Sequence, residues 1–179
     1  MRLEGVRCVV RPWRLTDAPA IVRHANNANV ARQLRDRFPH PYTIDDANAF
    51  LKFATAADPA NNLAIEVALE PVGGIGFVPG TDVERYSAEI GYWLGERHWG
   101  QGIATEALAL VTEYAFSRLH MLRLFALPFA DNVASARVLE KAGYVREGVL
   151  RASSVKFGKP RDQVIYARVN DRWENPEPS

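Results

Sequence analysis

The sequence contains a single cysteine, Cys8, and this scarcity excludes two kinds of architecture. One cysteine forms no internal disulfide and cannot supply the paired thiolates of a CxxC metal site. The four histidines do not stand at metal-ligand spacing either, so we predict that the protein holds no metal. Absent disulfides are typical of a reducing compartment, and we expect a cytoplasmic location.

Long apolar runs and a strong excess of one charge are also missing. No run approaches the roughly 20 apolar residues of a membrane span. The first ten residues lack the apolar stretch of a signal peptide. The formal net charge of +1 argues against a protein that coats nucleic acid. We therefore expect neither a membrane nor a nucleic acid as partner.

The chain also lacks internal repeats and low-complexity blocks. Its 179 residues, of which 47% are hydrophobic, are enough to bury one substantial core. The last residues are polar and include two prolines. We predict a single domain over residues 1–170 and a polar tail over residues 171–179.

The most informative stretch covers residues 87–114. Its pattern predicts a strand over residues 88–94, then a turn with three glycines, then a helix that begins near Ile103. The first turn of such a helix carries unpaired N–H groups and partial positive charge, so this turn is a candidate phosphate site. The spacing of the glycines matches neither a Walker loop nor a Rossmann fingerprint. A strand, a glycine turn and a helix also occur together without any ligand.

The remaining pattern predicts an α/β domain. Before the glycine turn we expect a helix that starts at Thr16 or Asp17, and another that starts at Thr43 with Asp46 completing a capping box. Residues 70–74 read as a turn, and residues 153–162 as the connection of a last hairpin. The expected strands cover residues 6–13, 62–70, 74–78, 88–94, 122–129, 145–150 and 163–169.

Pro128 bears on how two of these strands pair. The strand over residues 122–129 follows a strand and a helix, so it should lie parallel to the strand over residues 88–94. Proline donates no hydrogen bond to a ladder and is rare in a paired central strand. Its presence favours a separation of the two parallel strands there. The alternative is that the second strand is short or peripheral.

Two motifs resemble those of the GNAT acetyltransferases. Residues 99–104, WGQGIA, fill the six positions of the family motif [QR]xxGx[GA], with Trp99 in place of Gln or Arg. Residues 131–145, DNVASARVLEKAGYV, resemble the later family segment NxxS/AxxxxEKxGF/Y. The segment WGQGIATEAL resembles the corresponding segment of the RimJ/RimL-type branch, which acetylates protein N-termini. The resemblance implies a mixed, mostly antiparallel sheet that is flanked by helices and splayed between the fourth and fifth strands.

The resemblance also implies acetyl-CoA as cosubstrate and a set of residues that bind it. The pantetheine arm would contact the backbone of Tyr92, Trp93 and Leu94 and the amide of Asn132, which could equally cap the following helix. Trp99 opens the pyrophosphate motif. Backbone N–H groups would bind the pyrophosphate from Gly100, Gln101, Gly102, Ile103, Ala104 and Thr105.

Two residues are candidates for proton transfer. Glu89 is a lone carboxylate in an apolar strand, an environment that would raise its pKa and suit a general base. The alternatives are that Glu89 only orients the amine or faces solvent. By resemblance Ser135 is the candidate acid toward the coenzyme A thiolate, or a group that only caps the helix. Leu139 stands where many family members have a tyrosine acid.

The resemblance implies direct N-acetylation of a primary amine, favouring the α-amine of a protein N-terminus. A polyamine-like or aminoglycoside-like acceptor is one alternative, and a non-catalytic acyl-CoA-binding module is another. Residues 30–42 lie where the family builds its acceptor wall, although they could be an ordinary solvated loop. They include Arg32, Arg35 and Arg37, which disfavours a polycation. Homodimers are frequent in the family, so a homodimer is one expectation.

Overall fold

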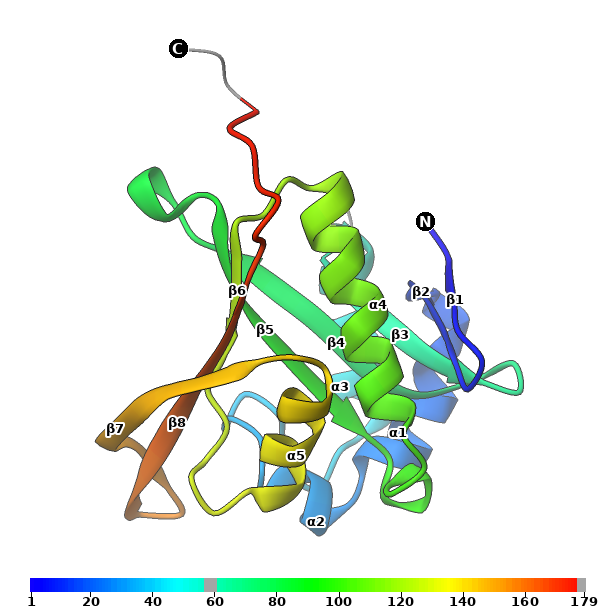
Figure 1. Cartoon of the computed structure of the whole chain (residues 1–179). Helices are drawn as coiled ribbons and strands as arrows, with labels where there is room; N and C mark the ends of the chain where they lie inside the picture. The colour runs from blue at the N-terminus through cyan, green and yellow to red at the C-terminus, as the bar shows by residue number, and fades with distance from the viewer. Residues whose placement is uncertain (57–60, 177–179) are drawn as a thin grey trace.

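The computed structural model describes residues 1–56 and 61–176, and its eight strands form one mixed sheet (Figure 1). Their order across the sheet is β1-β2-β3-β4-β5-β6-β8-β7, and only the β5–β6 pair is parallel among the described strands. The strands are β1 (Leu3–Glu4), β2 (Val9–Pro12), β3 (Asn62–Val67), β4 (Glu70–Pro79), β5 (Ser87–Leu94), β6 (Arg123–Ala126), β7 (Val145–Lys156) and β8 (Lys159–Val169).

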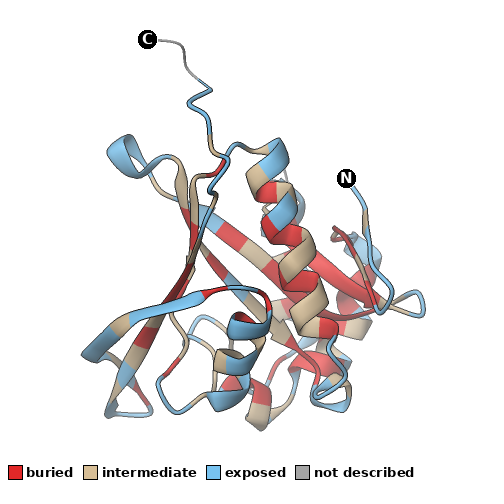
Figure 2. Ribbon diagram, viewed as in Figure 1, coloured by how far each residue is buried: buried red, intermediate tan, exposed pale blue. Residues whose placement is uncertain are grey.

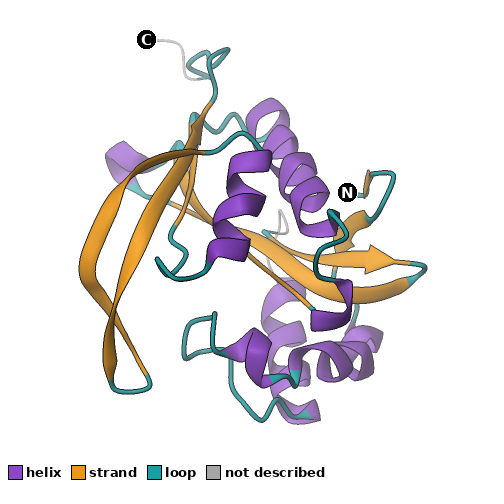
Figure 3. Cartoon of the chain, turned by 60° about the horizontal axis from the view of Figure 1, so that its bottom comes forward, coloured by secondary structure: helices purple, strands orange, loops and turns teal. Residues whose placement is uncertain are grey.

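Helices cover both faces of this sheet (Figure 3). They are α1 (Ala18–Ala25), α2 (Ala28–Ala31), α3 (Ile44–Ala56), α4 (Ile103–Arg118) and α5 (Val133–Lys141), with short 3-10 turns η1 (Leu15–Asp17), η2 (Asp82–Glu84) and η3 (Glu96–His98). The predicted capping box is confirmed at α3, where Thr43 and Asp46 exchange hydrogen bonds. No helix in the described ranges is long and apolar enough to cross a membrane.

The two faces of the sheet carry separate cores, and β5 contributes to both. Ile90 and Leu94 pack with Leu108 of α4 in the larger core. Trp93 packs on the opposite face with residues of α1 and α3, in the smaller core around Ile21. Because side chains alternate along a strand, the even-numbered residues of β5 face α4 and the odd-numbered residues face α1–α3. Figure 2 shows the buried residues concentrated between the helices and the sheet.

Two predicted turns are wrong. Residues 70–74 lie inside β4, and the chain reverses earlier, at Ala68 and Leu69, whose φ angles are +48° and +68°. The last hairpin has no long connection, because β7 and β8 extend until they meet at Phe157 and Gly158, with φ angles of +53° and +72°. Positive φ at both central residues matches the twist of a tight hairpin. These two turns are formed by four residues, and only one of them, Gly158, is of a type that typically signals a turn.

The predicted splay of the parallel strands is confirmed, but it begins before Pro128. The β5–β6 ladder runs only from Ser87 to Glu89, whereas β4 stays paired with β5 as far as Leu94. After Ala126 the chain follows β8 instead: the Val164 N–H donates to the Pro128 carbonyl at 3.0 Å. The two-residue β1 adds one strand to the count, so the splay separates the fifth and sixth strands.

Glu106, in the first turn of α4, ties the N-terminal segment to this helix. Its carboxylate accepts hydrogen bonds from the backbone N–H groups of Val6, Arg7 and Cys8, at 3.1, 2.7 and 3.0 Å. Burial opposes ionisation of this group, but the three N–H donors hold the pKa of Glu106 below its ordinary value. These contacts give Glu106 a structural role.

We expect Glu106→Gln to lower the free energy of unfolding by about 2 kcal/mol at pH 7. In the wild type the three backbone N–H groups donate to a carboxylate, whereas in the variant some of them would face the NH₂ group of an amide, which cannot accept a hydrogen bond. A depressed folded-state pKa contributes stability above the unfolded-state pKa, and this contribution is lost as pH falls through the folded-state value. The difference between wild type and variant should therefore shrink toward pH 3 in urea titrations. Glu113→Gln, at an exposed site on the same helix, is the control. An equal loss in both variants would contradict the role of Glu106.

Candidate active site

The turn between β5 and α4 is held in shape by its own side chains. The Trp99 indole Nε1 donates to the Leu94 carbonyl at 2.7 Å, and the Gln101 amide donates to the Arg97 carbonyl at 2.9 Å. Gly100 and Gly102 have φ angles of +73° and +76°, a region that disfavours residues with a Cβ. The turn therefore has a fixed backbone conformation that depends on glycine at both positions.

This conformation leaves a row of backbone donors at the start of α4. The first hydrogen bond of the helix is donated by the Glu106 N–H to the Gly102 carbonyl, at 3.1 Å. Among the described residues, the N–H groups of residues 100–105 meet no acceptor. Such a row at the N-terminus of a 16-residue helix is an anion site, because the helix dipole adds partial positive charge. These are the six residues that the sequence predicts to bind pyrophosphate, and their contact with a ligand stays a prediction.

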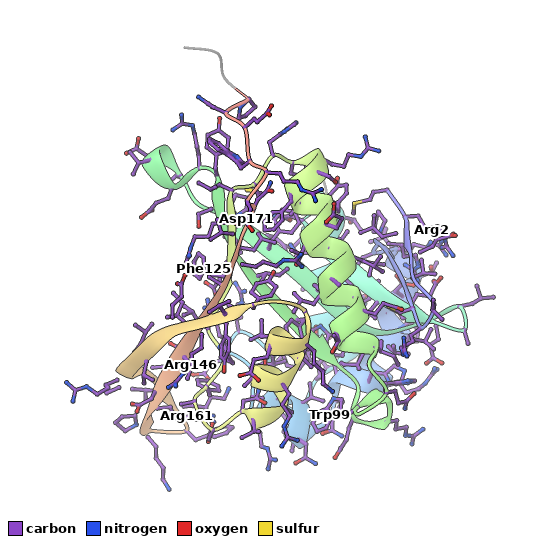
Figure 4. The ribbon with its side chains drawn as sticks, viewed as in Figure 1. Arg2, Trp99, Phe125, Arg146, Arg161 and Asp171 are labelled. Atoms are coloured by element: carbon purple, nitrogen blue, oxygen red, sulfur yellow. The ribbon has the colours of Figure 1, made fainter. Side chains whose placement is uncertain are left out.

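Arg7 lies beside this row, and the sequence reasoning missed it. Its guanidinium Nε lies 3.2 Å from the position that a Cβ at Gly102 would take, and Arg7 also pairs with Glu106 at 3.7 Å. Nothing local marks Arg7, since it reaches the turn through the backbone contacts of the N-terminal segment with α4. Trp99, the predicted opening residue of the motif, faces back to the end of β5 (Figure 4).

The neighbouring basic residues contact the other side of the turn. His98 stacks edge-on against His24 of α1, with ring centroids 5.3 Å apart. Burial, together with the nearby His24, lowers the pKa of His98. Arg97 lines a cavity of about 350 Å³ with Arg23 and His24. The described side-chain contacts of Arg97 and His98 are therefore toward α1.

Tyr92 and Ser135 form a hydrogen-bonded pair on the α4 face of the sheet. Their hydroxyl oxygens are 2.9 Å apart, and the Tyr92 hydroxyl also lies 3.2 Å from the Ser135 carbonyl. Burial is the main cause that raises the pKa of the Tyr92 phenol. We predicted only a backbone role for Tyr92. The strand alternation with Ile90 and Leu94 is the signal that would have placed its side chain on this face.

Asn132 caps α5, which brings Ser135 to Tyr92. The Asn132 side-chain oxygen accepts a hydrogen bond from the Ser135 N–H at 3.1 Å. This confirms the capping alternative for Asn132, and contact with a pantetheine arm stays a prediction. Leu139 is fully buried one turn further along α5. Many family members have a tyrosine at this position, and leucine provides no hydroxyl group there.

Glu89 lies on the opposite face of the sheet, and its predicted apolar surroundings are wrong. Its carboxylate forms an ion pair with the guanidinium of Arg35, which comes from the segment between α2 and α3. The Glu89 side chain is 29% exposed. The pairing depends on the odd–even alternation of β5, which turns Glu89 toward the α1–α3 face together with Trp93.

The gap in the sheet lies between these two groups. The β5–β6 ladder ends at Glu89, so the β6-facing edge of residues 90–94 has no strand partner within residues 1–56 and 61–176. Glu89 stands on one face at the mouth of this gap, and the Tyr92–Ser135 pair stands on the other. The glycine turn lies at the far end of β5 (Figure 1). The predicted site residues come from β5, the turn, α4 and the start of α5, and the described contacts join Tyr92, Ser135 and Asn132 directly.

Cys8 lies outside this arrangement, and the described residues form no metal-binding cluster. Cys8 is 4% exposed, and burial together with the neighbouring Glu106 raises the pKa of its thiol to about 12. A thiol with so high a pKa is a poor nucleophile, and Cys8 packs in the larger core. Within the described ranges, no three His, Cys, Asp or Glu residues lie close enough together to hold a metal ion.

Comparisons with known proteins place these features in a family. A family model described as an acetyltransferase (GNAT) domain matches residues 7–145. The chain is 42% identical over 103 residues to the uncharacterized N-acetyltransferase YoaA of Bacillus subtilis, covering 58% of each chain. It is 41% identical over 87 residues to the ribosomal-protein-serine acetyltransferase of Escherichia coli, covering 48% of each. The chain thus spans about half the length of these two curated relatives.

A solved structure agrees with the family model. The structure of Mycobacterium smegmatis RimJ in complex with CoA-disulfide superposes with a TM-score of 0.83, at 25% identity over 94% of this chain and 87% of that one. The family model covers most of the chain, including β2–β6, the glycine turn, α4 and α5. The chain belongs to the GNAT family of acetyltransferases.

Proposed function

We propose that the protein transfers the acetyl group of acetyl-CoA directly to a primary amine, and that the amine is a protein N-terminal α-amine. The observation that carries this proposal is the gap in the sheet. A row of free N–H donors stands at one end of β5, and proton-transferring side chains stand on the two faces of the gap. Both cosubstrates can thus meet between two strands without a covalent enzyme intermediate.

Acetyl-CoA would lie along β5. The N–H groups of residues 100–105 suit its pyrophosphate, and Arg7 adds a cation beside them. The unpaired edge of β5 at residues 92–94 offers backbone groups to the amides of the pantetheine arm. Leu94 is partly engaged, because its carbonyl already accepts the Trp99 indole. Asn132, at the start of α5, would contact the pantetheine arm from the other side of the gap.

The acceptor nitrogen loses two protons over the reaction, and the departing thiolate gains one. Glu89 would take the first proton from the ammonium, and the free amine would then attack the thioester carbonyl carbon. Collapse of the tetrahedral intermediate breaks the C–S bond, and the cationic nitrogen gives up its second proton, in balance with the proton that the thiolate receives, to leave the neutral amide. Ser135, with Tyr92 hydrogen-bonded to its hydroxyl, would protonate or stabilise the departing thiolate. Holding both reactants in the gap supplies much of the remaining acceleration.

The choice of an N-terminal amine rests on one relative and one local feature. The relative is named as a ribosomal-protein-serine acetyltransferase. The local feature is Arg35, which lies against the candidate base and disfavours a polycationic acceptor such as a polyamine. A small-molecule amine remains the alternative acceptor, and a module that binds acyl-CoA without turnover is the alternative function.

The test is release of free thiol from acetyl-CoA with a panel of acceptors. The panel contains N-terminal peptides, polyamines and aminoglycosides, and mass spectrometry locates the acetyl group. We expect turnover on peptide α-amines and none on the lysine side chains of N-terminally blocked peptides. Turnover only on small amines would overturn the peptide assignment. Tight acetyl-CoA binding without turnover on any amine would support the non-catalytic module.

We expect Tyr92→Phe to lower kcat by about tenfold while leaving the KM for acetyl-CoA nearly unchanged, because the lost hydroxyl orients Ser135 rather than the pyrophosphate. Ser135→Ala should cost at least as much. The double variant should be no worse than Ser135→Ala, since both residues act on one proton. Multiplying effects would contradict a shared role, and a near-full kcat in Ser135→Ala would remove Ser135 from the mechanism. Tyr114→Phe, on the outer part of α4, is the matched control.

A further inference from the structure

The segment between α2 and α3 is anchored to the β7–β8 hairpin beside Glu89. Lys156 of β7 donates to the Asp36 carboxylate at 2.7 Å, and Arg161 of β8 donates to the Arg32 carbonyl at 3.2 Å. The Lys156 side chain is only 5% exposed, so its ammonium is a fixed point in this contact. Arg35, next to Asp36, is thereby held at a defined place near the candidate base.

A cavity of about 320 Å³ lies between this segment and the hairpin. Its lining includes Arg35, Asp36, Phe129, Ser153, Ser154 and Lys156. The volume is at the lower end of the range for small-ligand sites, roughly 300–1,000 Å³, and suits the end of a chain or a small molecule. In Figure 4, Arg161 marks the hairpin side of this region, across α5 from Trp99 and the glycine turn. The cavity shares Arg35 with the ion pair of Glu89, so it lies next to the candidate base.

Three ion pairs line this region, and one differs from the others. Lys156 pairs with Asp36 and Arg161 with Asp131, and neither pair involves a residue of the proposed chemistry. Arg35 pairs with Glu89, which is the candidate base. The Arg35 guanidinium is thus already paired with the carboxylate that the ammonium of an acceptor must approach.

An entering ammonium changes the charge balance at this pair. An acceptor that brings only an ammonium places two cations, its own and Arg35, beside one carboxylate. An acceptor that also brings a carboxylate restores one anion for each cation, because Arg35 can pass from Glu89 to the new partner. The planar guanidinium can donate two parallel hydrogen bonds to a carboxylate, and this fork favours carboxylates over other acceptor groups.

We propose that the cavity is an anion subsite in which Arg35 binds a carboxylate carried by the acceptor near its reacting amine. The acceptor class is a peptide whose first or second residue is acidic, and a free α-amino acid shares the same chemistry. The assignment rests on the proposed function and names its substrate class. Arg35 is a specificity-determining residue that contacts substrate and takes no part in proton transfer.

The test compares peptides that differ only at the second residue: Ser-Glu, Ser-Gln and Ser-Lys followed by one common neutral sequence. Wild type should show kcat/KM in the order Glu, Gln, Lys, with about a five- to tenfold step between Glu and Lys carried mainly by KM. Arg35→Gln should remove the order. Arg37→Gln, an exposed arginine of the same segment, is the matched control and should keep it. Arg35→Lys should retain part of the preference, because it keeps the charge and loses the fork.

Several outcomes separate this proposal from the proposed function. Equal rates on the three peptides with wild type would overturn the anion subsite and leave peptide acetylation intact. A preference that survives in Arg35→Gln would also overturn it, provided thermal unfolding shows that the variant is folded. Turnover on free glutamate but on no peptide would support the subsite and overturn the peptide acceptor. An optimum with Ser-Lys would overturn the charge argument altogether.

Discussion

Glu89→Gln is expected to reduce kcat/KM about 100-fold or more at pH 7. A positioned general base contributes about 10²–10⁴ to a rate, and glutamine cannot accept the amine proton. Without the base, the enzyme must capture acceptors that are already neutral, and their fraction rises up to the α-amine pKa of about 8. The deficit of the variant should therefore shrink as pH increases. Stopped assays of thiol release from pH 6 to pH 9.5 measure both effects.

Two controls separate proton transfer from a disturbed site. Glu84→Gln replaces an exposed carboxylate in η2, away from the gap, and should leave the pH profile unchanged. The affinity of Glu89→Gln for acetyl-CoA, measured by calorimetry, should stay near the wild-type value, since the N–H row at α4 is untouched. A variant with the wild-type pH profile would exclude Glu89 as the base, and its contact with Arg35 would then be its only role.

Arg11→Met is expected to lower the free energy of unfolding by about 3–5 kcal/mol, because it strands two buried carboxylates. Arg11 of β2 donates to Glu66 of β3 at 2.5 Å and to both oxygens of Asp17 in η1, at 2.8 and 3.1 Å. The three side chains are 3–7% exposed. Glu66 also pairs with Arg2 at 3.5 Å, and Asp17 also accepts the Arg14 N–H at 2.8 Å. Removal of the shared cation leaves the two buried carboxylates with only these partners, and this loss of charge compensation is more costly than the loss of the pair itself.

Chemical denaturation of three variants tests this explanation. Arg14→Met makes the same change at an exposed site three residues along the chain, and should cost under about 1 kcal/mol. A triple variant, Arg11→Met with Asp17→Asn and Glu66→Gln, removes the stranded charges and should recover part of the loss. A triple variant less stable than Arg11→Met would show that packing, rather than charge, dominates at this site.

Local patterns predicted the parts of the fold that neighbouring residues determine. The glycine turn and the caps at Thr43 and Asn132 depend on contacts within a few residues, and the structure has them. The turn at residues 68–69 was missed because no glycine, proline or asparagine marks it. Pro71, Gly73 and Gly74 placed the expected turn a few residues too late, inside β4.

The partners of the candidate site residues could not be predicted in the same way. Glu89 meets Arg35 across 54 positions, and Tyr92 meets Ser135 across 43. Each contact depends on which face of β5 a residue occupies and on how a helix or loop docks against that face. A single sequence shows which residues alternate along the strand. It does not show which helix or loop packs against each face. The apolar pattern around Glu89 therefore suggested a buried acid where the structure has an ion pair.

The gap between β5 and β6 has a consequence for how long the protein survives in its folded state. An unpaired strand edge is a weak point in a sheet. A ligand that lies along it acts as a temporary extra strand and binds only the folded chain. Mass action then raises the unfolding free energy by about 2.7 kcal/mol at a ligand concentration 100 times Kd. Under the proposed function, resistance to heat and proteolysis would rise and fall with the supply of acetyl-CoA.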